Sequence, residues 1–547
     1  MNIFPKVCPS VMGEYKSKYF IYIYIIALIA LGVGYISVLP VFEGLDETAH
    51  FSRIRETAYS KKIKYESSID QSILKYTGPL PYSTGLPPFD NSNTYKKFFE
   101  NPKNISEYED KYVHSVLKKE FVSSDELNWQ YQHPPLYYII MSKIIFLTEN
   151  LNFIDQFYVL RIVSYCFAIL GIYFSIGIFF KKFINNFDLK NKKIFKLAIL
   201  IYPILFPEFF YEFARIGNDS LCLMFTGLLI LLVFNLDDDE INSKNIFFIG
   251  SVLGLGMITK ALFLPIIFGI ASYIFIKLFM ENKLNRIYNV ILFILPLLPV
   301  VIWYWLKYLQ TGDYGGGFEA FQLSQGDGII NGFVKNFTWL GLSHGFLMPF
   351  VTFTWIGSWS VFRMPLYLYI FLIMCSGWIY SNIIIFYLKN IKINNIHMQV
   401  VWILLFMISG LFWHVIIMVA LTGYGASGGN YLHILYPWLV PALYLGIKQI
   451  YNSNYQVFLL KLVLFFCLLF QILGYWYHIA LFSGCAIKSD DKSIVFSEKL
   501  YCLTSFKRVI GNLDILAYPY LGLVSFGVGI ILISLMIIFE LRVNNDE

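Results

Sequence analysis

Three residues that could transfer a proton follow the first long apolar run of the sequence. Asp46 lies four residues before His50 and Glu47 lies three before it, so a helix would carry all three on one face. Pro40 and Gly44 end the preceding helix, and Asp46 is a suitable N-cap for the next one. Two acids and an imidazole at a membrane surface could serve a proton-transfer or metal reaction. These residues alone fit a solvated, capped loop helix equally well.

The composition indicates a membrane protein. Hydrophobic residues make up 57% of the 547 residues and charged residues 14%, whereas soluble domains carry about 25% charge. The net charge of +6 is spread over short loops, so it reflects membrane topology and gives no reason to expect nucleic-acid binding. The cysteines include no CxxC pair and no Cys/His set with zinc spacing. The sequence therefore predicts an all-α polytopic membrane protein.

Apolar runs predict about twelve transmembrane helices with both termini in the cytoplasm. Basic residues such as Lys181 and Lys182 follow the expected inner ends, as the positive-inside rule requires. Residues 136–147 are too short to span a membrane, which takes about 20 residues, so we expect an interfacial helix on the outer surface. The expected spans are 19–40, 157–180, 194–212, 219–236, 246–260, 262–280, 287–306, 364–388, 398–421, 432–450, 456–482 and 519–541.

Long outer loops are expected at 42–134, 307–363 and 483–518. The first ends in His133-Pro-Pro, and a histidine before two prolines favours a rigid, extended start to the following helix. The second turns apolar from Phe333 to Trp359, a stretch that could dip into the membrane. Cys485 and Cys502 share the last loop on the oxidising side, where they could form a disulfide.

Charged residues near the membrane gather at the outer ends of the expected helices. Each costs about 3 kcal/mol at the centre of a helix, so a collection of both signs near the outer surface fits a site for a charged lipid headgroup. Any single one could instead extend its charge to the interface, and Asp219, after the break Arg215-Ile-Gly-Asn, could simply cap the next helix. The residues are Arg161, Glu208, Glu212, Arg215, Asp219, Lys260 and Arg363.

Six short pieces of sequence, in this order and placement, resemble the GT-C glycosyltransferases of the protein O-mannosyltransferase and aminoarabinose-transferase type. More closely, they resemble a bacterial branch of predicted membrane proteins of unassigned function. In that branch the last piece usually reads Gly-Arg-Tyr, and here Asn430 stands in place of the arginine. The pieces are Leu45-Asp-Glu-Thr-Ala-His-Phe51, His133-Pro-Pro-Leu-Tyr-Tyr138, Gly217-Asn-Asp-Ser220, Leu255-Gly-Met-Ile-Thr-Lys260, Trp355-Ile-Gly-Ser-Trp359 and Gly428-Gly-Asn-Tyr-Leu432.

The resemblance implies a GT-C-like catalytic module in residues 1–482, followed by a C-terminal loop and last helix in 483–547. It implies an inverting transferase that moves a sugar from polyprenyl phosphate, such as undecaprenyl phosphate, to a surface glycan or lipid-linked acceptor. The active site would face outward from the bacterial cytoplasmic membrane. A divalent metal could take part, although the sequence gives no ligand set.

Roles for individual residues follow from the same resemblance. Asp46 matches the family's first-loop aspartate and would be the base. Glu47 and Asp219 would position the acceptor or the sugar, and His50 would orient the acidic pair. Cationic side chains would balance charge on the leaving phosphate, and the expected substrate-binding residues are Arg215, Lys260, Arg363, His133, Arg161, Asn430 and Tyr431.

Other functions stay open at this stage. A polymerase or ligase for a surface polysaccharide of the O-antigen type would share substrates, membrane and topology with such a transferase. A flippase for lipid-linked glycans would need a continuous polar path, and the expected spans are almost free of charge at their centres. A non-catalytic partner in glycan assembly would tolerate Asp46→Asn. The sequence gives neither the sugar nor the acceptor.

Overall fold

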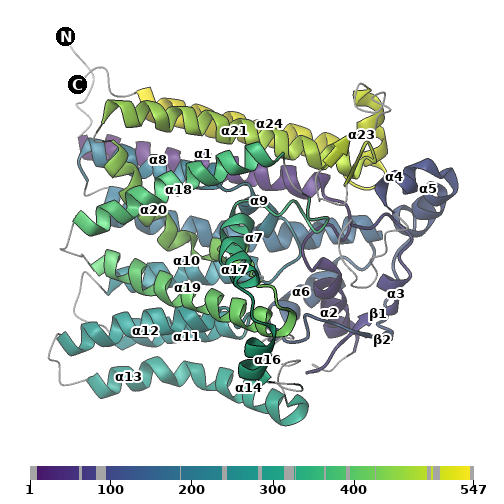
Figure 1. The fold of residues 1–547 in the computed structure, drawn as a ribbon, viewed down its shortest axis with the longest axis horizontal. Coiled ribbons are helices and arrows are strands. Elements are labelled where there is room, and N and C mark those ends of the chain that lie inside the picture. Colours follow the sequence, from purple (N-terminus) through teal and green to yellow (C-terminus); the bar gives the residue numbers. More distant parts are fainter. Residues whose placement is uncertain are drawn as a thin grey trace.

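The computed structural model is a bundle of long helices that run side by side, with a layer of shorter elements over one end (Figure 1). Apolar faces of the helices pack against one another and form one continuous hydrophobic core. The structure describes residues 9–60, 65–81, 94–184, 187–236, 243–280, 286–312, 326, 328–362, 365–389, 395–425, 427–451, 453–488, 494–496 and 505–542.

Each apolar run that the sequence marked as a span contains a described helix. These helices are α1 (Pro9–Val38), α7 (Phe153–Phe179), α8 (Leu189–Leu205), α10 (Asp219–Asn235), α11 (Ser243–Met257), α12 (Phe263–Met280), α13 (Arg286–Ile294) with α14 (Leu298–Thr311), α18 (Leu366–Lys389), α19 (Asn395–Thr422), α20 (Tyr436–Ile450), α21 (Asn454–Phe482) and α24 (Pro519–Arg542).

Length and composition separate these helices into two groups. Long apolar stretches that could cross a membrane number 6 among the described residues, and further apolar stretches have 10–17 residues, such as Ile370–Ile385 within α18. The helical membrane fold is thus confirmed, and the number of twelve spans stays a prediction. The 6 long stretches are Lys18–Val38, Phe153–Ile184, Ile287–Thr311, Gln399–Thr422, Asn454–Phe482 and Pro519–Leu541.

The first expected outer loop folds into the layer at the end of the bundle. Its two strands pair antiparallel, with Ser68 opposite Leu127 and Asp70 opposite Ser123. Asp70 also binds Arg55 at 2.7 Å, which holds this ladder against the first helix of the loop. The elements are α2 (Glu47–Tyr59), β1 (Ser68–Asp70), α3 (Gln71–Leu74), α4 (Tyr95–Glu100), α5 (Pro102–Tyr108), the π-helical η1 (Glu109–Val113), β2 (Ser123–Leu127) and α6 (Leu136–Leu147).

Helix α6 has the bounds that the sequence predicted. It packs beside α2 in the outer layer (Figure 1), burying Tyr137, Tyr138 and Met141 and leaving Leu147 81% exposed. A short apolar helix with one buried and one exposed face fits an interfacial position. Its depth in the membrane stays a prediction.

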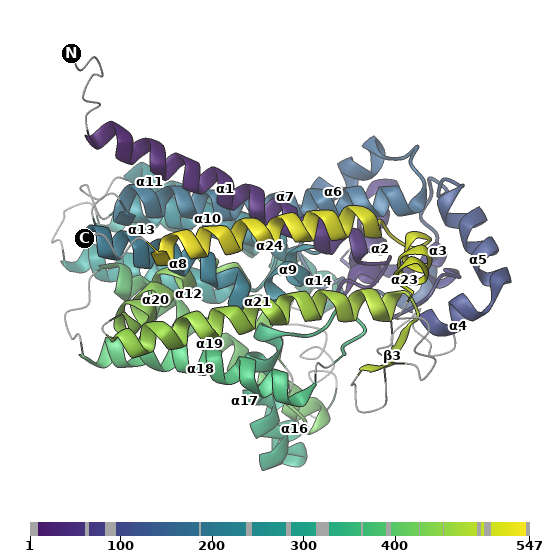
Figure 2. The same ribbon diagram turned by 90° about the horizontal axis from the view of Figure 1, so that it is seen from above.

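The remaining elements join the long helices. Helices α16 and α17 run across the bundle direction (Figure 2), and β3 pairs antiparallel with β4. Helices α16 and α17, in the second outer loop, include most of the stretch from Phe333 to Trp359 that was expected to dip into the membrane. The elements are η2 (Phe180–Ile184), α9 (Glu208–Phe213), η3 (Leu295–Leu297), α16 (Gly328–Asn336), α17 (Trp339–Thr354), the 3₁₀ turn η4 (Gly429–Leu435), β3 (Ala486–Lys488), β4 (Ile494–Phe496) and α23 (Phe506–Asp514).

The last helix, α24, packs along α1 (Figure 2). Glycines permit the close approach, because a Cβ added at Gly34 would lie 2.9 Å from Phe526 and one at Gly529 would lie 2.5 Å from Leu31. The C-terminal segment therefore belongs to the same helix bundle. Cys485, just after α21, is disulfide-bonded, and Cys502 lies outside the described residues.

Candidate active site

Asp46 lies between α1 and α2 in a strained backbone conformation. Its φ is 59°, in the left-handed region that non-glycine residues seldom adopt, although Asp and Asn adopt it more readily than others. It occupies the N-cap position of α2, as predicted, but its carboxylate makes no capping bond. Instead, Oδ1 of Asp46 accepts a hydrogen bond from Nε1 of Trp129 at 2.7 Å.

The carboxylate of Glu47 is fully occupied by hydrogen bonds. Its two carboxylate oxygens accept hydrogen bonds from Arg161 at 2.8 and 2.6 Å and from the backbone N–H groups of Gly44 and Ile216, both at 2.9 Å. The sequence assigned Glu47 to the chemistry and Arg161 to substrate binding. The structure pairs these two residues with each other and leaves neither side chain open to a substrate.

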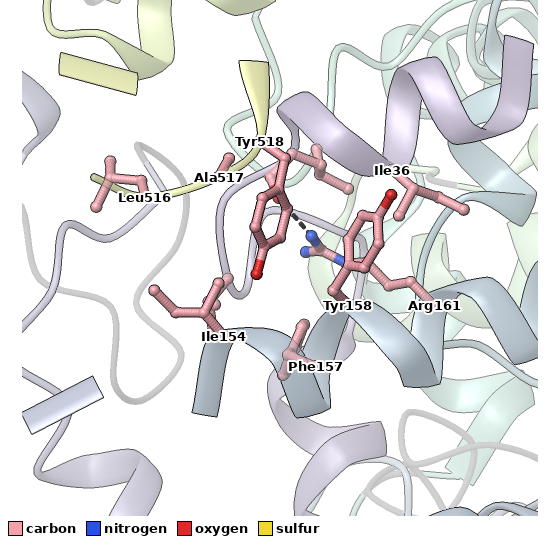
Figure 3. A pocket seen from close by; sticks show the side chains of 10 residues that line it. Ile36, Ile154, Phe157, Tyr158, Arg161, Leu516, Ala517 and Tyr518 are labelled. Atoms are coloured by element: carbon pink, nitrogen blue, oxygen red, sulfur yellow. Dashed lines mark hydrogen bonds between the residues drawn. The ribbon is translucent and has the colours of Figure 1, made fainter. Parts of the chain in front are cut away.

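A small cavity adjoins Arg161 (Figure 3). It measures about 10 Å³, which is room for about one water molecule. Arg161 also donates to the backbone carbonyls of Leu39 and Pro40. The cavity is too small for a sugar or a lipid phosphate. It is lined by Ile36, Leu39, Val41, Ile154, Phe157, Tyr158, Arg161, Leu516, Ala517 and Tyr518.

His50, on α2, and His133, at the end of the first outer loop, lie together. Their rings stack with centroids 6.2 Å apart and planes 8° apart, and a hydrogen bond of 2.9 Å joins Nδ1 of His50 to the hydroxyl of Tyr138. Burial lowers the pKa of both imidazoles, and the positive charges of Arg215 and Lys260 lower it further. Both histidines are therefore neutral near pH 7.

Four of the seven charged residues expected at the outer helix ends form a buried network. Nζ of Lys260 donates to both oxygens of Asp219, at 2.7 and 2.9 Å. Arg215 donates to Asp219 at 2.9 Å and also to Glu212. Glu212, Asp219, Arg215 and Lys260 are exposed by at most 7%, so every charge in the network has an opposite charge beside it.

Asp219 is not the helix cap that the sequence also allowed. The N-cap of α10 is Asn218. Asp219 is the first residue of α10 and links Lys260 to Arg215. Its position explains why a lysine can lie buried at the end of an apolar helix, since a buried charge needs a partner.

Asn430 and Tyr431 complete the network from η4. The Asn430 amide donates to Glu212 at 2.7 Å, and Nζ of Lys260 lies 4.3 Å from the centre of the Tyr431 ring. Asn430, which was expected to bind substrate, thus contacts an acid of the network. Arg363, the remaining expected phosphate ligand, lies outside the described residues.

Glu43 was not among the residues singled out from the sequence, yet it connects three segments of the chain. Its carboxylate accepts hydrogen bonds of 2.7 Å from each of Tyr95, Ser358 and Ser360. Burial raises the pKa of Glu43, and these hydrogen bonds oppose the rise. Its backbone carbonyl accepts from Trp359 at 2.7 Å. The Trp-Ile-Gly-Ser-Trp piece was the one available signal for this junction.

Backbone strain gathers at the same junction. The non-glycine residues with positive φ in the described chain are Phe42 at 69°, Asp46 at 59°, Ser358 at 61° and Val361 at 46°. All four lie within four residues of Glu43 or of its serine partners in sequence. Strained backbone persists where surrounding contacts hold it, and active sites are a common place for it.

In the described part of the chain, Asp46 has one free carboxylate oxygen, as does Glu208, but the free Oε1 of Glu208 is fully buried. Both carboxylate oxygens of Glu43, Glu47, Glu212 and Asp219 accept hydrogen bonds. Asp46 is partly exposed, and no described residue donates to its Oδ2. Among the described residues, no group of three His, Cys, Asp or Glu side chains is placed to hold a metal ion.

Residues 29–437 match the family described as "Predicted membrane protein (DUF2142)". The chain belongs to this family. The DUF2142 match runs from α1 to the start of α20, so it includes Asp46, the charged network and Asn430. No curated protein matches the chain in sequence.

Two solved structures have a similar arrangement of the chain. One is the crystal structure of ArnT from Cupriavidus metallidurans bound to undecaprenyl phosphate, with a TM-score of 0.41, 10% identity, and coverage of 97% of this chain and 77% of that chain. The other is apo ArnT from the same organism, with a TM-score of 0.34, 10% identity, and coverage of 73% and 66%. At these scores the likeness carries no argument about activity.

Proposed function

We propose that this DUF2142 protein is a glycosyltransferase of the GT-C type. It transfers a sugar from a polyprenyl phosphate to a glycan or lipid-linked acceptor at the outer face of the cytoplasmic membrane. One observation carries the proposal: Asp46 presents a free carboxylate oxygen, and Arg215, which shares Asp219 with Lys260, donates to the adjacent carbonyl of Leu45 at 2.9 Å. A base beside two cations is what this transfer requires.

Asp46 acts as the base in the proposed reaction. Oδ2 accepts the proton of the acceptor hydroxyl while that oxygen forms its bond to C1 of the sugar. The bond between C1 and the phosphate oxygen breaks in the same displacement, and the bonding electrons leave with the phosphate. A positioned base contributes about 10²–10⁴-fold to such a step.

Lys260 and Arg215 balance the charge that gathers on the leaving phosphate. An ammonium has three donor hydrogens, and Asp219 accepts two of them from Lys260, which leaves one for a phosphate oxygen. Nε of Arg215 is buried without a hydrogen-bond partner and supplies a further donor. Cations held in place before the reaction cost no reorganisation during it.

Purified protein tests the proposal when it is incubated with polyprenyl-phosphate sugars and membrane glycans. We expect release of free polyprenyl phosphate together with an acceptor that gains the mass of one sugar residue. Mass spectrometry of surface glycans from cells with and without the gene then identifies the product. The same protein is also placed in lipid vesicles that contain the donor. If the donor crosses the vesicle membrane intact and no acceptor gains mass, the protein is a flippase and the proposal is wrong.

A further inference from the structure

The end of the first outer loop runs along α2 and contacts it at successive points. The amide of Asn128 donates to the carbonyl of Ala49 at 3.0 Å, and the indole of Trp129 donates to Asp46. The ring of His133 then stacks on His50. The segment is fixed independently at its start, where the N–H of Asn128 donates to Ser67 at 2.9 Å.

The bond between Trp129 and Asp46 differs from these anchors in its chemistry. An indole N–H is a donor only, and a bond to a carboxylate is charge-assisted and about twice as strong as a neutral one. Trp129 uses it to hold Oδ1, while no described residue donates to Oδ2 of Asp46. The bond thus makes the two oxygens of one carboxylate different from each other.

We infer that Trp129 is a positioning residue of the proposed glycosyl transfer: its indole N–H holds the Asp46 carboxylate by Oδ1 and leaves Oδ2 to accept the acceptor proton. This inference rests on the proposed function and adds a residue to it. Because Asn128 and His133 already attach the loop to α2, the indole N–H is not needed to keep the loop in place. Its effect falls on the carboxylate.

The electrostatics of Asp46 give this role a measurable consequence. Burial raises the pKa of Asp46, and the Trp129 hydrogen bond is the first of the interactions that oppose the rise. The charged groups that also face Asp46 are Arg215, Lys260 and Asp219, and a change at Trp129 leaves all three in place. Loss of the N–H should therefore raise the pKa of Asp46.

The test is Trp129→Phe, which keeps an aromatic ring and removes the donor. We expect kcat to fall about 10-fold, because a loosened base costs rate, with the KM for the polyprenyl-phosphate sugar unchanged. The acid limb of the pH–rate profile should move to higher pH. Trp413→Phe is the matched control, because Trp413 is 54% exposed on α19 and far from the chemistry in sequence.

A second variant, Trp129→His, restores a ring N–H in a smaller side chain. It should keep more activity than Trp129→Phe and a pH profile closer to that of the wild type. A Trp129→Phe protein with wild-type kcat and pH profile would overturn the inference, as would a Trp129→His protein less active than Trp129→Phe. Absence of sugar transfer by the wild-type protein would instead overturn the proposed function, so the two failures are distinguishable.

Discussion

Arg161 on α7 and Glu47 on α2 form a buried ion pair through two hydrogen bonds, of 2.8 and 2.6 Å. Their side chains are only 3% and 0% exposed. The pair fixes the layer at the end of the bundle to the long helices, because Glu47 is the first residue of α2, directly after the proposed base, and α7 is one of the long helices. We therefore expect the pair to hold the position of Asp46.

Arg161→Ala should destabilise the protein strongly, since it leaves the Glu47 carboxylate buried without its partner. Removing one member of a buried pair costs about 3–5 kcal/mol of unfolding free energy. Lys119→Ala is the control, because it removes a pair of 3.0 Å whose side chains are 49% and 33% exposed, and such a pair contributes about 0–1 kcal/mol. Thermal unfolding in detergent compares them, and equal melting temperatures would contradict a structural role for the Arg161 pair.

Lys260→Ala should weaken use of the donor. Its ammonium is the cation proposed to meet the lipid phosphate, so the loss in kcat/KM should correspond to about 1–3 kcal/mol. The measurement is the rate of sugar release against the concentration of polyprenyl-phosphate sugar. Lys143→Ala, which changes an exposed lysine of α6, should leave these kinetics as they are. Wild-type donor kinetics in Lys260→Ala would show that the phosphate is bound elsewhere.

The rate should fall as the pH is lowered through the pKa of Asp46. A base must be ionised to accept a proton, and burial raises the pKa of Asp46 above the ordinary aspartate value of about 3.9. The acid limb should therefore lie above that value, with full activity on its alkaline side. Burial lowers the pKa of His50, so His50→Ala should retain the limb. If the acid limb of the pH–rate profile disappears in His50→Ala, the limb belongs to the imidazole of His50 and not to Asp46.

Glu43→Ala should loosen the junction between the first and second outer loops. It removes three side-chain hydrogen bonds from Tyr95, Ser358 and Ser360, and the unfolding free energy should fall by at least about 2 kcal/mol. Hydrogen exchange should rise in residues 355–362. Glu100→Ala, at a residue whose side chain is 63% exposed, should change neither quantity. Unchanged exchange in Glu43→Ala would mean that other contacts hold the junction.

The helices could be predicted from the sequence because the signal is local. A membrane core excludes unpaired backbone groups, so runs of apolar residues must form helices, and each expected span contains one. The bounds of α6 followed from the same reasoning, since 136–147 is apolar but too short to cross. Resemblance placed Asp46, Asp219 and Lys260 in one site, and the structure brings Asp219 into contact with Lys260.

The pairing of side chains could not be predicted, because it depends on contacts between distant segments. Glu43 and Ser360 are 317 residues apart in sequence, and Glu47 and Arg161 are 114 apart. No spacing rule links such positions. The sequence also predicted that Asp46, Glu47 and His50 share one helical face. Their side chains instead bind three separate partners, which are Trp129, Arg161 and Tyr138 respectively.

Asp46→Asn is the most direct test of the central claim that Asp46 is the catalytic base. Asparagine tolerates a positive φ as aspartate does, and its side-chain oxygen can still accept the Trp129 hydrogen bond, so the fold should survive. It cannot accept a proton, and sugar transfer should fall by about 10²-fold or more. Glu47→Gln should reduce transfer less, and His50→Ala least.

The measurement is the turnover of a polyprenyl-phosphate sugar by purified wild-type and Asp46→Asn proteins with matching melting temperatures. We expect a folded variant that binds the donor and transfers sugar at no more than about one hundredth of the wild-type rate. A folded Asp46→Asn protein with near wild-type turnover would contradict it.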